Sequence, residues 1–499
     1  MLAQVIAEAS RRYKDQPAYV TARGEQVTYE LLDRASDEAA AGLRHRGVGE
    51  GDVIALLLPS GPAYSVAYLA AAKAGAVTAG VNERLAAKER LACLAVADPR
   101  LVIADPAVAR DCDLAGWDCV EVDSTLPPPR VLAELRLPSA DPPVLPPDPD
   151  RPVAIVFTSG TTGTPKGALF ANRQLDAISE IDAGKRWGGG GTTLSATSYA
   201  HLGYMTKLPQ VLRGGGTTYL MERWDAGEAL DLVERCRLTT LGGIPTQVAL
   251  MLRHERFDLV DTSSVQAIVI GGGPATPALV REARERFGAT VLVRYSCTEA
   301  GTGTGTSPAD PPEDAETTVG RPRGSVELTV RALDGSLLDA GETGEVCLRS
   351  PASMSCYYRD PEATAAALWP DGAVRTGDLG YLDDLGRLHL AGRAKEMYVR
   401  GGYNVFPAEV EAVLAEDPAV ADAAVAPRPD PVMGEVGVAV VVPRDPAKPP
   451  TLDSLRSHAR GHLASYKLPE AIMIVEELPR TPMEKIDRRA LAAMAAETS

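Results

Sequence analysis

The sequence predicts an α/β protein with a large N-terminal domain, a β-rich subdomain within it, and a small α+β domain at the C-terminus. The chain has 499 residues, which corresponds to roughly two to four domains of ordinary size. Over its first 300 residues, helical patterns alternate with short apolar runs. From about residue 320 the pattern changes to β-rich segments with turn signals, and from residue 396 onwards both patterns occur together.

The N-terminal elements follow a regular order. Helical patterns cover 31–43, 63–74 and 90–96, and apolar runs cover 53–58, 76–77 and 101–103. Apolar strands that alternate with helices indicate a parallel sheet covered on both faces. A proline-rich stretch at 127–152 interrupts the order, and we interpret it as a surface connection.

The order resumes after this connection. Strands are expected at 153–157, 239–241, 267–270 and 290–293, and in the β-rich part at 344–348 and 386–390. These strands are the remaining ones expected in the large domain.

Composition excludes several classes of protein. With 51 Lys+Arg against 67 Asp+Glu the net charge is −16, so the chain lacks the basic surface of a nucleic-acid binder. Seven cysteines without a C-x-x-C pair favour reduced thiols over a disulfide framework or a zinc knuckle. The apolar stretch 64–81 carries Lys73, which favours a buried helix over a membrane span, and no signal-peptide pattern opens the sequence. We expect a cytoplasmic protein.

The strongest local motif is T-S-G-T-T-G-T-P-K-G at 158–167, directly after an apolar run. Glycines let backbone N–H groups turn inward, hydroxyls add donors and a lysine adds a point charge, so the segment predicts a phosphate cradle. It is not a Walker loop, since neither Ser nor Thr follows the lysine. A flexible surface turn is the alternative. The candidate residues are Thr158, Ser159, Gly160, Thr161, Thr162, Gly163 and Lys166.

This loop resembles the phosphate loop of the adenylate-forming superfamily, which includes acyl-CoA synthetases, aryl-CoA ligases, luciferases and peptide-synthetase adenylation domains. The resemblance covers essentially the whole chain and is strongest to the acyl-CoA synthetase (acyl-CoA ligase) branch. It implies an N-terminal domain of stacked sheets over 1–394, a mobile C-terminal lid domain over 395–499, and a hinge at Lys395.

Three further motifs match the nucleotide site of this family. The match of Y-S-C-T-E at 295–299 to Y-G-x-T-E implies that Tyr295 lies against the adenine, that Thr298 bonds the α-phosphate and that Glu299 holds Mg²⁺. The T-G-D at 376–378 and the G-R-A-K-E at 392–396 imply that Asp378 accepts from the ribose hydroxyls and that Arg393 reaches the ribose or the phosphates. Taken alone, Thr298-Glu299 would be interpreted as a helix start, and Asp378 and Arg393 as solvated charges. Four motifs in the family's order favour the nucleotide site instead.

Two C-terminal motifs resemble the mobile parts of the family. The segment starting at Arg400-Gly401-Gly402 matches a glycine loop that lines the pantetheine tunnel in the second half-reaction, although a plain hairpin turn is the alternative. P-R-T-P-M-E-K-I at 479–486 resembles P-[RK]-T-x-x-G-K-[IL], which implies that Lys485 bridges the substrate carboxylate and the α-phosphate.

Glu484 stands where the family motif has glycine. A Cβ resists positive φ, and a carboxylate adds negative charge where ATP docks. Two like charges ~4 Å apart cost about 4 kcal/mol at an effective dielectric near 20. One hypothesis is therefore that adenylation is weakened and that the enzyme mainly converts a supplied acyl-adenylate; the other is that Glu484 faces solvent and both steps run.

Glycine-rich segments indicate where the acid binds. By resemblance, Gly243 and Gly271 border the acyl pocket, Gly272 and Gly273 lie under the adenine, and His201 gates the acyl and thiol channels unless it is an ordinary packed histidine. Peptide-synthetase domains place an aspartate in the segment that aligns with 199–203 to pair the substrate amino group, and this segment contains none, so a simple carboxylic acid is favoured. Only 5 Phe and 4 Trp suggest a roomy pocket for a bulky alicyclic, aryl or medium-chain acid.

The expected function is ligation of a carboxylic acid to coenzyme A through an acyl-adenylate, with ATP (or acyl-AMP), Mg²⁺ and CoA as ligands. Lys485, Glu299, Thr298, Lys166 and Gly402 are the expected catalytic residues. Three alternatives remain: a thioesterification enzyme that takes its acyl-adenylate from a separate adenylating enzyme, a loader of carrier proteins, and a silent nucleotide-binding or scaffolding protein. The sequence favours no particular oligomeric state.

Overall fold

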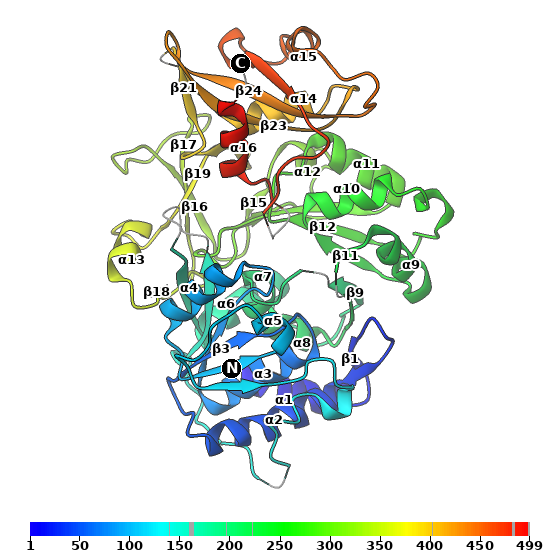
Figure 1. The fold of residues 1–499 in the computed structure, drawn as a ribbon, viewed down its shortest axis with the longest axis vertical. Helices are drawn as coiled ribbons and strands as arrows, with labels where there is room; N and C mark the ends of the chain where they lie inside the picture. The colour runs from blue at the N-terminus through cyan, green and yellow to red at the C-terminus, as the bar shows by residue number, and fades with distance from the viewer. Residues whose placement is uncertain are drawn as a thin grey trace.

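The computed structural model describes residues 1–138, 140–158, 164–195, 197–221, 223–401, 403–481 and 485–497. In this part of the chain the strands form two large sheets and two small ones. Figure 1 shows the β23–β24 sheet at one end of the molecule, the α9–α11 region in the middle, and α1 and α2 at the opposite end. The expected α/β class with a multi-sheet N-terminal part and a small C-terminal part is confirmed.

One large sheet is mostly parallel, as predicted. Its order is β18 (Cys356–Tyr357), β8 (Lys166–Ala171), β7 (Pro152–Thr158), β4 (Val77–Gly80), β3 (Val53–Leu57), β5 (Leu101–Ala104) and β6 (Cys119–Glu121). The strands from β7 to β6 are parallel, and every residue of β3, β4 and β5 is buried. β8 and β18 extend this sheet in antiparallel pairing at one edge, outside the apolar runs from which the parallel sheet was predicted.

The second large sheet carries several of the glycine segments at its strand ends. Its order is β15 (Arg321–Pro322), β14 (Thr304–Gly305), β13 (Thr290–Tyr295), β12 (Ala267–Gly271), β11 (Thr240–Gly243), β9 (Thr192–Ser195), β10 (Thr217–Leu220), β1 (Pro17–Val20) and β2 (Gln26–Thr28). β11, β12 and β13 are parallel, so their carboxyl ends lie at one edge.

Two small sheets follow in the chain. The first contains β16 (Glu327–Arg331), β17 (Gly344–Arg349), β19 (Val374–Leu382) and β20 (Leu388–Arg393). The second contains β22 (Tyr403–Val405), β21 (Tyr398–Arg400), β24 (Gly434–Pro443) and β23 (Val420–Asp430), with β25 (Ala471–Ile474) paired to β24. We call the second sheet and its helices the small unit.

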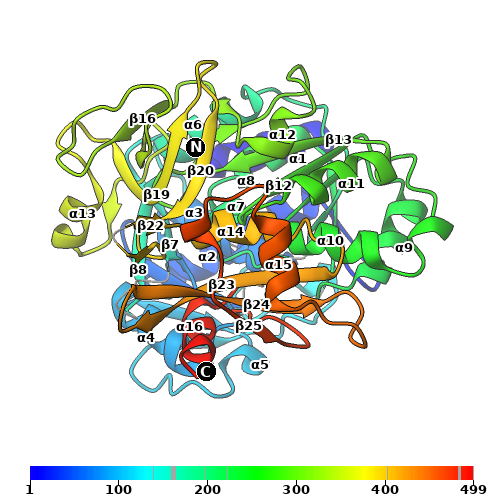
Figure 2. The same ribbon diagram turned by 90° about the horizontal axis from the view of Figure 1, so that it is seen from above.

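The helices cover the faces of these sheets, as seen from two directions in Figures 1 and 2. Those of the large part are α1 (Leu2–Tyr13), α2 (Tyr29–His45), α3 (Pro62–Ala74), α4 (Ala87–Ala97), α5 (Pro106–Ala109), α6 (Asn172–Ala183), α7 (Leu202–Met205), α8 (Leu208–Gly214), α9 (Ala226–Cys236), α10 (Pro245–Arg253), α11 (Pro277–Phe287), α12 (Asp314–Thr317) and α13 (Pro361–Ala367). Those of the small unit are α14 (Pro407–Leu414), α15 (Leu452–Ala459) and α16 (Arg488–Ala496). Single turns lie at η1 (Pro128–Arg130), η2 (Phe257–Leu259) and η3 (Ser465–Lys467).

The apolar stretch 64–81 forms α3 and β4, as the sequence predicted for a buried helix. Lys73 of α3 is only 7% exposed and bonds to the carboxylates of Asp33 at 2.6 Å and Asp37 at 2.7 Å on α2. These ion pairs compensate the buried positive charge of Lys73, the residue that argued against a membrane span in this stretch. Among the described residues, none of the helices has the length and apolarity needed to span a bilayer.

Hydrogen bonds join the small unit to the large part of the chain. The guanidinium of Arg253 on α10 donates to the carbonyl of Ala421 at 2.8 Å. Arg480 donates to the Thr246 hydroxyl at 3.2 Å and pairs with Asp422 at 2.8 Å. These contacts hold β23 and Arg480 against α10.

α16 is fixed to the rest of the small unit by its first residue. Arg488 binds the Glu411 carboxylate of α14, with one N–O distance of 2.9 Å, and pairs with Glu396 at 3.2 Å. Glu411 is 8% exposed, so this is a buried ion pair.

Candidate active site

The first group of site residues surrounds Asp378 on β19. Asp378 is 8% exposed; it accepts a hydrogen bond from the Tyr295 hydroxyl at 2.7 Å and pairs with Arg393 Nε at 3.1 Å. Arg393 faces Asp378 because the two residues are cross-strand partners on β19 and β20. Burial raises the pKa of Asp378, and Arg393 and the Tyr295 hydroxyl oppose this rise. A buried carboxylate with an adjacent cation suits recognition of hydroxyl groups beside phosphate.

Lys485 lies beside this group although it comes from the other end of the chain. Burial and the charge of Arg393 lower the pKa of Lys485, whereas Asp378 raises it. The same lysine lowers the pKa of His201. The residue as a whole still has solvent-accessible surface although its ammonium group is partly desolvated, so a ligand can reach it. The structure therefore brings together four predicted residues from distant parts of the sequence.

A second group contains the two ends of the predicted phosphate loop. Thr158 and Lys166 are cross-strand partners on β7 and β8, and Lys166 Nζ lies 5.2 Å from the centroid of the Tyr357 ring. The Tyr357 hydroxyl donates to the Glu299 carboxylate. Burial, together with Glu299, raises the pKa of Tyr357. The predicted residues Ser159, Gly160, Thr161, Thr162 and Gly163 lie outside the described part of the chain.

Glu299 is the predicted magnesium ligand, with Thr298 beside it in the turn after β13. Among the described residues, no group of three His, Cys, Asp or Glu side chains is arranged to hold a metal ion. Mg²⁺ commonly uses one or two carboxylates together with substrate phosphates rather than an all-protein cage. A single carboxylate near the ends of a phosphate loop fits that mode.

His201 is placed at the start of α7 and is largely enclosed. Its Nε2 lies 2.9 Å from the side-chain amide nitrogen of Asn82. Burial, Lys485 and Arg84 together lower the pKa of His201 to about 4, so the ring is neutral at pH 7. The sequence did not identify Asn82 or Tyr357, since neither belongs to a recognisable motif.

The predicted glycines lie at the carboxyl edge of the second large sheet. Gly243 ends β11 and Gly271 ends β12, next to Tyr295 at the end of β13. Gly272 has φ +78°, which favours glycine, and a Cβ at Gly271 would lie 3.2 Å from the Arg294 carbonyl oxygen. The strand ends therefore present backbone to any ligand at this edge, the usual position of sites in open α/β sheets.

The small unit holds the remaining predicted residues. Arg400 pairs with Glu470, so its contact lies within the small unit and not with the Asp378 group. Gly401, with φ +56°, directly follows β21, which pairs antiparallel with β22. Gly402 and Glu484 lie outside the described residues, and Lys395 lies in the exposed turn between β20 and β21.

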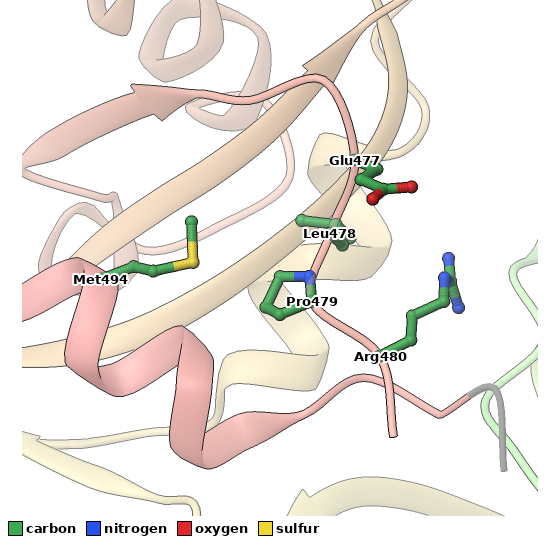
Figure 3. Close-up of a pocket in the computed structure, with 5 residues that line it drawn as sticks. All are labelled: Glu477, Leu478, Pro479, Arg480 and Met494. Carbon is green, nitrogen blue, oxygen red and sulfur yellow. The ribbon is translucent and has the colours of Figure 1, made fainter. Parts of the chain in front are cut away.

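A hollow on the small unit is separate from these groups. It is lined by Glu477, Leu478, Pro479, Arg480 and Met494, and Figure 3 shows Arg480 reaching away from Met494 of α16. None of the predicted site residues lines it.

Comparison with known proteins assigns the family. The family model described as AMP-binding enzyme matches residues 6–358, and that described as AMP-binding enzyme C-terminal domain matches residues 409–485. The chain therefore belongs to the AMP-binding enzyme family. The resemblance to adenylate-forming enzymes is confirmed.

Two curated relatives and one solved structure illustrate the similarity. Indoleacetate–CoA ligase of Aromatoleum aromaticum is 33% identical over 475 residues, covering 92% of this chain and 91% of the relative. The fatty acid–[acyl-carrier-protein] ligase ScoC of Streptomyces coeruleorubidus is 32% identical, and the match covers 95% of this chain and 92% of the relative. ATP-bound MatB from Rhodopseudomonas palustris has a TM-score of 0.88 at 27% identity, covering 100% of this chain and 99% of that one.

Proposed function

We propose that the protein is an ATP-dependent acid–thiol ligase that converts a carboxylic acid to its CoA thioester. The reaction is carboxylate + ATP to acyl-adenylate + pyrophosphate, then acyl-adenylate + CoA to acyl-CoA + AMP. The observation that carries this proposal is the convergence of Lys485 with Asp378, Arg393 and His201. A catalytically inactive scaffolding protein would not need Lys485 beside these residues.

In the first step, an oxygen of the carboxylate attacks the α-phosphorus and pyrophosphate leaves. Asp378 accepts from the ribose hydroxyls, while Tyr295, Gly272 and Gly273 border the adenine. Thr298, Arg393 and Lys485 stabilise the negative charge that develops around the α-phosphorus.

The pyrophosphate side of the site is formed by the loop from Thr158 to Lys166. Lys166 adds a positive charge near Tyr357 and Glu299. When bound, Mg²⁺ would be held by Glu299 and the phosphates and would neutralise phosphate charge.

In the second step, the thiol of CoA attacks the acyl carbonyl carbon and AMP leaves with the bonding electrons. We propose that 1–394 and 395–499 move as two domains about a hinge at Lys395, which brings Arg400, Gly401 and Gly402 to the thiol path. The pairing of Arg400 with Glu470 supports movement of that loop together with its sheet.

The acid is proposed to be a bulky alicyclic, aryl or medium-chain carboxylate. The glycines at 243 and 271 leave the strand ends without side chains. We propose that His201 borders the acyl channel. The aromatic acid in the name of the Aromatoleum relative agrees with this class.

Two alternative forms of the proposal differ in the thiol acceptor or in the source of the acyl-adenylate. The carrier-protein ligase among the relatives supports a phosphopantetheinylated carrier as an alternative acceptor. Glu484 in place of the motif glycine supports a thioesterification enzyme supplied with acyl-adenylate by another protein.

Two assays on the purified protein test these assignments with a panel of bulky carboxylic acids. The first measures acid-dependent pyrophosphate release from ATP, and the second measures thioester formation from synthetic acyl-adenylates with CoA or with a carrier. Activity in both identifies a complete ligase. Thioester formation alone assigns the second half-reaction, and inactivity in both contradicts the proposal.

A further inference from the structure

The hydrogen bonds of Asn82 determine which way its side-chain amide faces. The residue is 3% exposed and lies between β4 and α4. Its Oδ1 accepts the backbone N–H of Arg84 at 2.9 Å. A backbone N–H can only donate, so this atom must be the amide oxygen and the other must be the nitrogen.

The amide nitrogen of Asn82 therefore donates toward His201. Nε2 of the ring, 2.9 Å away, has to accept and cannot carry a proton. The single proton of the neutral ring then resides on Nδ1. Among the described residues, none accepts a hydrogen bond from Nδ1, so that proton is available to a ligand.

The charges around the ring agree with a neutral imidazole. Among the described residues, the charged groups that act on His201 are Arg84, which follows β4, and Lys485, which precedes α16, and both are cations. Together with burial they disfavour an imidazolium. An imidazolium beside Lys485 would also compete with that lysine for a substrate carboxylate.

We propose that Asn82 is a positioning residue that holds His201 as the neutral Nδ1–H tautomer, so that the ring offers an N–H donor to an oxygen of the bound acid or acyl-adenylate. The identity of that ligand rests on the proposed function, whereas the tautomer concerns the ligand-free protein. A lone pair at Nδ1 would repel the same oxygen, so the tautomer decides whether the contact is attractive.

The tautomer can be read by nitrogen NMR of full-length protein labelled with ¹⁵N-histidine. The chain has 6 histidines, and the signals lost in His201→Gln assign the ring. We expect a pyrrole-type shift for Nδ1 and a pyridine-type shift for Nε2 at neutral pH. A protonated Nε2 in the wild type would overturn the proposal without any variant having to fold.

Asn82→Asp reverses the hydrogen-bond requirement with almost no change in shape. The carboxylate still accepts from the Arg84 N–H, but its second oxygen also accepts, so Nε2 must become the donor. We expect the tautomer to invert or the ring to protonate, the acid limb of the pH–rate profile to move to higher pH, and kcat/KM to fall by about tenfold or more.

Asn172→Asp is the matched control. Asn172 is also buried, at 6% exposure, and its amide accepts from Leu2 N–H at 3.2 Å and donates to the Asp148 carbonyl at 3.1 Å. It should leave the His201 signals and the acid limb unchanged. Unchanged His201 signals in Asn82→Asp would refute the proposal. The expected tautomers in a protein inactive in both half-reactions would refute the proposed function alone.

Discussion

Replacing Tyr295 with phenylalanine removes one hydrogen bond to the buried carboxylate of Asp378. The phenol oxygen lies 2.7 Å from Oδ2, and the Asp378 side chain is 11% exposed. A hydrogen bond to a charged group in such a place is worth about 1.5–3 kcal/mol. The second partner, Arg393, is 63% exposed, so solvent screens its contribution to about 1 kcal/mol or less. The Tyr295 hydrogen bond therefore supports the ionised carboxylate together with the charge of Arg393.

We expect Tyr295→Phe to raise KM for ATP in the pyrophosphate-release assay by roughly 10- to 100-fold, since each 1.4 kcal/mol is a factor of ten. The sign of the pH effect follows from the carboxylate. Burial already raises the pKa of Asp378, and loss of a donor to the charged form raises it further. In the proposed role of Asp378 activity needs the ionised form, so activity is lost as pH falls through this pKa, and the acid limb of the variant should lie at higher pH.

Tyr381→Phe is the control on the same strand, where the Tyr381 ring stacks on His389 at 4.7 Å. It should change neither KM for ATP nor the acid limb. If Tyr295→Phe keeps both within about twofold of the wild type, the reasoning that ties Asp378 to nucleotide binding through this hydrogen bond is wrong.

Three further variants separate the roles proposed for other residues. Lys485→Met should slow pyrophosphate release by about 10²- to 10³-fold while thioester formation from supplied acyl-adenylate continues; equal losses in both assays would contradict its assignment to the first step. Glu484→Gly should increase acid-dependent pyrophosphate release if the carboxylate hinders ATP, and an unchanged rate would end that hypothesis. Lys73→Met leaves Asp33 and Asp37 without their cation and should lower the free energy of unfolding by about 3 kcal/mol, seen as a lower urea midpoint; an unchanged midpoint would show that the buried pairs do not stabilise the fold.

Apolar runs in the sequence located strands well but did not reveal every strand direction. The buried strands β3, β4 and β5 and the helix α3 are found where the patterns predicted them. β8 pairs antiparallel with β7, so the segment 158–167 joins neighbouring antiparallel strands. A buried strand is apolar whether it runs parallel or antiparallel to its neighbour, because the sequence pattern indicates burial and not strand direction.

The site could be predicted only where residues belong to motifs. All residues of the Asp378 group were predicted, because each belongs to a short contiguous sequence motif. Asn82 and Tyr357 contribute through contacts made by the folded chain, to His201 and Glu299 respectively. Such partners carry no local pattern, so only the three-dimensional arrangement identifies them.

The ion pairs of Arg488 make α16 a useful site for optical labels. Arg488 is three residues beyond Lys485, and its bonds to Glu411 and Glu396 fasten this end of the chain to the small unit. A fluorophore on α16 and an acceptor on α9 of the large part would therefore report the position of Lys485, the proposed catalytic lysine, through energy transfer. Single-molecule traces recorded during turnover could then test whether Lys485 moves relative to the large part, as the proposed hinge at Lys395 requires, and how long each position lasts.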